Sequence, residues 1–223
     1  MVIAVGIAGM IVQMRLRSVV AKYSQVPTPS GLTGAEIAEK MLRYNGVNDV
    51  KIVHTGGYLT DHYNPLTKTV NLSDEVYSGR SITAAAIACH ECGHALQHAT
   101  GYAPVKMRSA LVPLVQFSSS MATWLVIGGL IMTASSGSDM LCWIGVGLMC
   151  FSVLFSIVTL PVEYNASNRA LAWLEQSGLL FDEELEGAKI SLRWAARTYL
   201  VAALSAIASI LYYVALINCR RRD

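Results

Sequence analysis

The chain has 223 residues, a net charge of +2 and only 14% charged residues, against about 25% in an average soluble domain. So small a net charge gives no basic excess for neutralising phosphates, and we expect no nucleic-acid partner. Four long runs contain no charged residue. The composition therefore disfavours a purely soluble globule and predicts a mostly α-helical protein of the lipid bilayer with three or four transmembrane helices. The uncharged runs are Met1–Met14, Ser109–Ser138, Met140–Val162 and Thr198–Cys219.

The chain begins with a short apolar segment that we interpret as a membrane anchor over residues 1–20. The uncharged run Met1–Met14 would rise only about 21 Å as a helix, less than the ~30 Å of bilayer hydrocarbon. Arg15 and Arg17 can lengthen the span by reaching toward the headgroups. No basic residue precedes the run and no A-x-A-like site follows it, so we do not expect a signal peptide.

Residues 21–110 predict a soluble part with two helices and a small antiparallel sheet. Thr33 and Glu36 fit a capping box at the start of the first helix. The second helix is expected from about Ser81 to Thr100, closed by Gly101 and Pro104. Between the helices, alternating apolar residues and an Asn64-Pro65 turn favour strands. The expected strands are Val50–His54, Tyr58–Tyr63 and Lys68–Leu72.

Residues 111–162 predict a transmembrane hairpin, because Leu111–Thr133 and Met140–Val162 both reach the length of about 20 apolar residues that a bilayer requires. The alternative, a buried hairpin of a soluble core, would require a domain of this size to bury three uncharged runs of more than 20 residues. Pro161 is expected to break the helix at the membrane edge.

Residues 163–197 are expected to form a second soluble part, which is helical, and residues 198–219 a C-terminal transmembrane helix. One helix is predicted from Glu163 to Gln176. Another should begin near Asp182 and continue into the last membrane segment.

The basic residues near the membrane segments predict the orientation. Seven lie on the face that carries both soluble parts, and three follow the last segment, so we expect the soluble face in the cytoplasm. The seven are Arg15, Arg17, Lys22, Lys106, Arg108, Arg193 and Arg197, and the three are Arg220, Arg221 and Arg222. The C-terminal arginines oppose this assignment if the last helix spans fully.

The predicted helix from Ser81 to Thr100 contains His90-Glu91-Cys92-Gly93-His94, an H-E-x-x-H motif. Residues four apart on a helix project from one face, so both imidazoles can bind one Zn²⁺. Zinc lowers the pKa of water toward about 7, and the neighbouring Glu91 can take its proton as a general base. Two incidental histidines on a core helix are the alternative. We interpret Cys89 and Cys92, which formally make a C-x-x-C pair, as small helix residues.

A catalytic zinc needs a third protein ligand, and Glu163 is the strongest candidate. A transmembrane hairpin returns the chain to the side it left, so Glu163 must share a face with His90. The alternative role for Glu163 is a carboxylate at a helix N-terminus. The metzincin extension fails, because Gln97 and Thr100 stand where its Gly and third His are expected. His98 would crowd the same helix face, so we favour a supporting or structural role over ligation.

These segments resemble the membrane-bound neutral zinc metallopeptidase family of the YugP type. The resemblance is carried by His90–His98, by Leu59–Pro65 with Lys68–Ser73, and by Pro161–Glu163 with Ala166-Ser167. It implies a zincin-like soluble part and a zinc peptidase with His90 and His94 as ligands and Glu91 catalytic, in a bacterial cell membrane.

The layout is also similar to the integral-membrane gluzincins of the HtpX and CAAX-protease type. Those proteins usually carry Asp four residues after the glutamate ligand, where this chain has Ser167. A serine can form a hydrogen bond but lacks the charge of the aspartate.

Several other residues near the motif keep two interpretations. Tyr58–Leu72 could offer an edge strand to an extended substrate or simply cover the core. For Asp61 and His62 we favour structural roles over stabilising the reaction. Arg169 could polarise a substrate carbonyl or pair with a carboxylate such as Glu175.

The sequence thus predicts an integral-membrane zinc endopeptidase acting on peptides or proteins, with membrane-associated or misfolded proteins suggested by its location. The alternative is a membrane zinc-binding or scaffold protein without turnover. An intact Glu91 disfavours that alternative, because a structural zinc site needs no base. The sequence does not indicate an oligomeric state.

Overall fold

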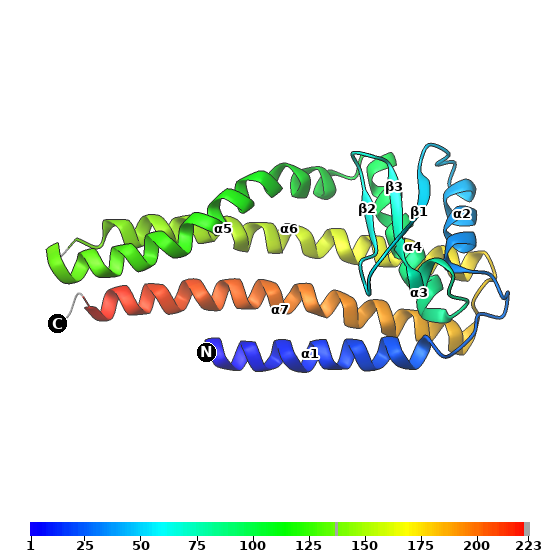
Figure 1. Ribbon diagram of the computed structural model, residues 1–223, viewed down its shortest axis with the longest axis horizontal. Coiled ribbons are helices and arrows are strands. Elements are labelled where there is room, and N and C mark those ends of the chain that lie inside the picture. Colours follow the sequence, from blue (N-terminus) through cyan, green and yellow to red (C-terminus); the bar gives the residue numbers. More distant parts are fainter. Residues whose placement is uncertain (137, 221–223) are drawn as a thin grey trace. The chain divides into compact units, whose positions relative to one another are not determined.

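In the computed structural model, which describes residues 1–136 and 138–220, the helices and strands follow one another as Figure 1 shows. The mostly helical class is confirmed. The helices are α1 (Val2–Tyr23), α2 (Gly34–Tyr44), α3 (Asp74–Tyr77), α4 (Ile82–Ala99), α5 (Ala103–Ser136), α6 (Met140–Gln176) and α7 (Asp182–Arg220). The strands are β1 (Lys51–Thr55), β2 (His62–Asn64) and β3 (Thr69–Ser73).

The chain divides into two compact units, each described by itself below. The first consists of Met1–Ile11, Lys106–Leu160 and the chain from Thr198 onward. The second consists of Val12–Val105 and Pro161–Arg197. The second unit contains the sheet, the H-E-x-x-H helix and Glu163, so it holds every residue of the expected zinc site.

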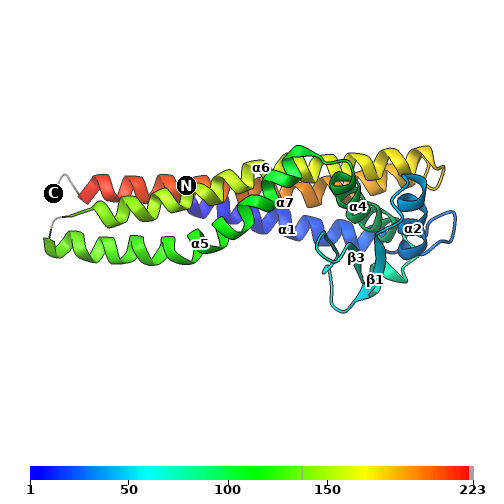
Figure 2. The ribbon, with the colours of Figure 1, turned by 90° about the horizontal axis from the view of Figure 1, so that it is seen from above.

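Four helices within the described part of the chain are long and apolar enough to cross a membrane: α1, α5, α6 and α7. The expected three or four transmembrane helices are therefore confirmed by length and composition. Helix α1 has 22 residues and rises about 33 Å, so it extends well beyond the uncharged run at its start. Within the first unit, Val126 of α5, Cys142 and Val146 of α6 and Ile217 of α7 form a small buried cluster. Figure 2 shows these parts of the three helices side by side.

The predicted helix break at Pro161 is wrong, because α6 is continuous from Met140 to Gln176. Proline removes one backbone N–H, so the carbonyl of Ile157 loses its usual helical partner. Apolar helices tolerate this loss when neighbouring groups satisfy the freed carbonyl. Glu163 is therefore an interior residue of one long helix rather than the start of a new one.

The other helix ends agree with their sequence signals. The Thr33 hydroxyl accepts a hydrogen bond from the Glu36 N–H, and the Glu36 carboxylate accepts one from the Thr33 N–H, so the predicted capping box is confirmed. The Ser81 hydroxyl caps α4 by accepting from the Ala84 N–H at 3.2 Å. Helix α7 begins at Asp182 and continues into the last apolar run, as predicted.

The sheet is mixed, so the expectation of an antiparallel sheet is correct for one strand pair and wrong for the other. The order is β1-β3-β2, with β2 antiparallel and β1 parallel to β3. Strand β3 takes the centre because its Val70 and Leu72 are fully buried. Strand β2 is shorter than predicted, since Gly57 and Leu59 have positive φ angles that turn the chain out of an extended conformation. It forms one edge of the sheet.

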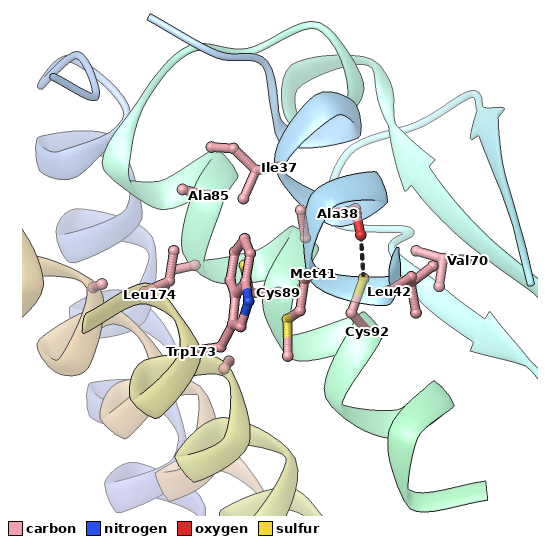
Figure 3. Close-up of a cluster of buried hydrophobic side chains, with 14 of the residues drawn as sticks. Ile37, Ala38, Met41, Leu42, Val70, Ala85, Cys89, Cys92, Trp173 and Leu174 are labelled. Atoms are coloured by element: carbon pink, nitrogen blue, oxygen red, sulfur yellow. Dashed lines mark hydrogen bonds between the residues drawn. The ribbon is translucent and has the colours of Figure 1, made fainter. Parts of the chain in front are cut away.

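The core of the second unit joins α2, β3, α4 and the C-terminal part of α6. Figure 3 shows Trp173 and Leu174 of α6 beside α4, with residues of α2 on the other side. Cys92 lies in this core, and its thiol points toward the carbonyl oxygen of Ala38 at 3.6 Å. Two helices and the sheet therefore hold α4 in place.

Helix α4 crosses the C-terminal part of α6 at very close range. A Cβ added at Gly93 would lie 2.6 Å from the carbonyl oxygen of Ala166 and 3.0 Å from its Cα. Both are backbone atoms and cannot turn aside as a flexible side chain would. Only glycine fits here, and Gly93 lies between the two histidines of the motif.

We predict that Gly93→Ala lowers the free energy of unfolding by about 1–3 kcal/mol, because the added methyl group forces α4 and α6 apart. Thermal unfolding of the purified protein in detergent measures the effect. Gly147→Ala is the matched control, since nothing lies within 4 Å of a Cβ at that position of α6. The control should unfold at the temperature of the wild type or at a slightly higher one. Equal stability of the two variants would contradict the close crossing.

Candidate metal centre

Helix α4 presents His90 and His94 on one face, as their spacing predicts. Their ring centroids are 4.8 Å apart with an edge-to-face arrangement. Both side chains are largely buried, with 14% and 11% of their surfaces exposed. The pair therefore forms a nearly closed site on α4.

Helix α6 brings Glu163 to the same point. Its carboxylate oxygen Oε2 lies 3.2 Å from Nε2 of His90 and 3.6 Å from Nε2 of His94. The residue is buried, with 1% of its surface exposed. One ligand atom from each of the three residues lies within 4.8 Å of the other two. The structure thus brings together the three ligands expected from the sequence.

These donors fit a zinc ion. Two ligands about 2.1 Å from a tetrahedral ion lie about 3.4 Å from each other, which is close to both measured separations from Glu163. Two imidazoles and one carboxylate also form a ligand set common in catalytic zinc sites. His90, His94 and Glu163 are therefore suited to hold the metal, with a fourth position left for water or substrate.

The charge on Glu163 agrees with ligand chemistry. Burial alone would raise the pKa of the Glu163 carboxyl, but hydrogen bonds with His90 and His94 hold this pKa well below its usual range. Burial would lower the pKa of His94, and the hydrogen bond with Glu163 raises it instead. Glu163, which lies just beyond the uncharged run ending at Val162, is thus held as a carboxylate, the form that binds metal.

Glu91 lies beside the ligands on α4 and is buried. Its Oε2 accepts a hydrogen bond of 2.9 Å from the backbone N–H of Tyr63 in β2. In the antiparallel register Tyr63 faces Val70 of β3, yet its N–H points to Glu91. The outer edge of β2 therefore borders the candidate site. The motif gave no signal for this contact, since it depends on how the sheet packs on α4.

Each histidine also has a partner on its other ring nitrogen. The Ser167 hydroxyl lies 3.1 Å from Nδ1 of His90 and comes from α6, four residues after Glu163. Gln97 Oε1 lies 3.1 Å from Nδ1 of His94. The sequence interpretation considered Gln97 only where a metzincin has glycine and missed this contact. The available signal was its position three residues after His94 on the same helix.

Asp61 and His62 have structural partners. Asp61 accepts hydrogen bonds from the backbone N–H and the hydroxyl of Ser73, at 2.7 and 3.0 Å. Burial raises the pKa of Asp61, and the nearby negative charge of Glu91 adds to the effect. His62 is exposed, and its Nδ1 donates to the carbonyl oxygen of Thr60 at 2.8 Å. These contacts fix the conformation of the chain where it enters β2.

His98 and Arg169 lie outside the three-ligand cluster. The His98 ring packs against Tyr63 with centroids 5.4 Å apart. Arg169 donates from Nε to Asn165 Oδ1 at 2.9 Å and from Nη2 to the Thr100 hydroxyl at 3.4 Å. Its observed partners are thus polar side chains rather than Glu175.

The two cysteines of the motif helix are fully buried in the core. Burial raises the pKa of the Cys89 and Cys92 thiols far above their usual range, so neither supplies a thiolate at neutral pH. Their interpretation as small helix residues agrees with this environment.

Comparisons with known proteins identify the family. The family described as "Putative neutral zinc metallopeptidase" matches residues 1–218. The chain is 42% identical over 202 residues to the "Putative membrane protease YugP" of Bacillus subtilis strain 168, which covers 91% of this chain and 88% of that protein. No solved structure matches significantly. The chain therefore belongs to the family described as putative neutral zinc metallopeptidases, to which its motif segments pointed.

Proposed function

We propose that this protein is an integral-membrane zinc metallopeptidase of the gluzincin type that hydrolyses peptide bonds with Glu91 as general base. The observation that carries the proposal is the cluster of His90, His94 and Glu163, whose ligand atoms lie within 4.8 Å of one another. Glu91 adjoins the cluster on α4. The family membership of the chain supports the same activity.

Zinc, when bound by these three residues, would supply a Lewis acid that polarises a peptide carbonyl and makes water acidic enough to lose a proton near neutral pH. Glu91 receives that proton, and the resulting carboxylic acid donates it to the leaving amine. The hydrogen bond from the Tyr63 N–H orients Glu91 and leaves its other oxygen available for the proton. Burial of the site limits competition from bulk water.

The edge strand β2 provides a surface for the substrate. A peptide extended along β2 would pair through main-chain groups other than the Tyr63 N–H, which bonds Glu91. Main-chain pairing binds many sequences alike. We therefore propose a peptide or protein substrate, with membrane-associated or misfolded proteins favoured because the chain contains four apolar helices of spanning length.

The proposed location is the bacterial cell membrane, with the candidate site on the cytoplasmic face. The relative in Bacillus subtilis is named a membrane protease, which supports a membrane location. The orientation is argued from the excess of basic residues beside the soluble parts.

The central test of the activity is Glu91→Gln in the purified, zinc-loaded protein. We expect cleavage of an unfolded protein substrate to fall at least about 100-fold, because the amide cannot accept the proton. Zinc content should stay unchanged, since Glu91 is not one of the three ligands. Glu175→Gln is the control, as this carboxylate is exposed near the end of α6. Undiminished cleavage by Glu91→Gln would refute the general base. Zinc binding without cleavage by the wild type would favour the non-catalytic zinc-binding alternative.

The ligand assignment is tested by His94→Ala and Glu163→Gln. Each variant removes one of three ligands, so zinc affinity should fall by more than the 10- to 100-fold that loss of a supporting group costs. Competition with a chromophoric chelator measures the affinity, and removing zinc from the wild type should abolish cleavage reversibly. Affinities equal to that of the wild type would place the metal elsewhere.

The orientation is tested by a cysteine at Leu66, which is 93% exposed between β2 and β3. The exposed Cys150 and Cys219 are first replaced by serine. A membrane-impermeant maleimide should label Leu66→Cys only after bacterial cells are permeabilised. Ser138→Cys, in the linker on the predicted opposite face, should be labelled in intact cells. The reverse pattern would place the candidate site outside the cytoplasm.

A further inference from the structure

Gln97 is fully buried at 0% exposure and makes three polar contacts. Its Oε1 lies 3.1 Å from Nδ1 of His94. Its Nε2 lies 2.7 Å from the backbone carbonyl oxygen of Val162 and 3.0 Å from Oδ1 of Asn165. A buried amide whose donor and acceptor ends are all used has little freedom to rotate.

The orientation of this amide follows from its partners. A backbone carbonyl oxygen only accepts hydrogen bonds, so the Gln97 atom facing Val162 must be the NH₂ group. The other atom, which faces His94, is then the carbonyl oxygen and only accepts. The hydrogen must therefore lie on Nδ1 of His94. Nε2 of His94 is then the nitrogen that faces the Glu163 carboxylate and the candidate metal position, and it is the nitrogen free to bind a metal once it carries no proton.

Asn165 is fixed by the same reasoning. The Arg169 guanidinium only donates hydrogen bonds, and its Nε donates to Asn165 at 2.9 Å. The Asn165 atom that faces Arg169 is therefore its oxygen, and the same oxygen accepts from Gln97. A guanidinium, which only donates hydrogen bonds, thus anchors the network at one end.

We propose that Gln97, held by Val162, Asn165 and Arg169, is a positioning residue that fixes the tautomer and ring orientation of His94 for metal binding. This inference rests on the proposed metal site. Ser167 beside His90 differs in one respect, because its hydroxyl can donate or accept and does not dictate a tautomer. The hydrogen-bond partner of His94 therefore dictates which ring nitrogen carries the hydrogen, whereas the partner of His90 does not.

A purely structural role for Gln97, in which it only joins α4 to α6, makes a different prediction. Such a role depends on the NH₂ group that bonds Val162 and Asn165. The positioning role depends on the oxygen that faces His94. Gln97→Glu separates the two, since a carboxylate lacks the NH₂ group but presents an acceptor oxygen to His94 in either orientation.

The test measures zinc affinity of the full-length protein in detergent by chelator competition, without reference to activity. Gln97→Met fills the same volume and removes the acceptor, so affinity should fall 10- to 100-fold. Gln97→Glu should stay within about threefold of the wild type. Gln176→Met and Gln176→Glu are the matched controls, at an exposed position of α6, and should not change the affinity. If Gln97→Met does not fold, Gln97→Asn replaces it, because the shorter side chain withdraws the oxygen from His94.

The outcomes separate this inference from the proposed function. Equal losses of zinc affinity in Gln97→Met and Gln97→Glu would indicate a purely structural role for Gln97 and would overturn the positioning role. Unchanged zinc affinity in both variants would also overturn it. A wild type that binds no zinc, or whose zinc is unaffected by His94→Ala, would instead overturn the metal site itself. Loss in Gln97→Met with retention in Gln97→Glu supports the inference.

Discussion

The close crossing of α4 and α6 is the constraint on which the candidate metal centre depends. Gly93 allows the backbones to approach so nearly that no Cβ fits beside Ala166. This approach sets the 3.2 and 3.6 Å separations between Glu163 and the two histidines. A wider crossing would leave a buried carboxylate without its partners, which is costly in an apolar interior. The same side chains that stabilise the interface thus form the candidate site.

The environment of the cluster also explains the unusual polarity of this core. Gln97, Glu163 and Ser167 are buried polar residues, and each has a partner at hydrogen-bond distance in the second unit. A network of this kind is stable only when its members are satisfied. The network also restricts each side chain to one conformation. A metal site benefits from this, because its ligands are already in position before the metal binds.

Much of the site could be predicted from the sequence, because H-E-x-x-H fixes a helix face and a transmembrane hairpin returns Glu163 to the side of the two histidines. The starts of α2 and α4 were also predictable, since capping residues act over one turn. The continuity of α6 through Pro161 was not, because the local signal of proline is overridden by the apolar helix around it. The parallel pairing of β1 with β3 was not predictable either, because these two strands are not consecutive in the chain and the alternation of apolar residues does not indicate which strands pair. The contacts of Glu91 with Tyr63 and of Gln97 with His94 depend on packing between elements, or on side-chain direction, and motif spacing does not give either.

X-ray absorption spectroscopy of the zinc-loaded wild-type protein tests the proposed metal centre most directly. We expect a four-coordinate ion with two imidazole nitrogens and oxygen ligands at about 2.0–2.2 Å, and no sulfur. A zinc–sulfur distance of about 2.3 Å would assign the metal to cysteine and contradict ligation by His90, His94 and Glu163. A spectrum with fewer than two imidazoles would also contradict it.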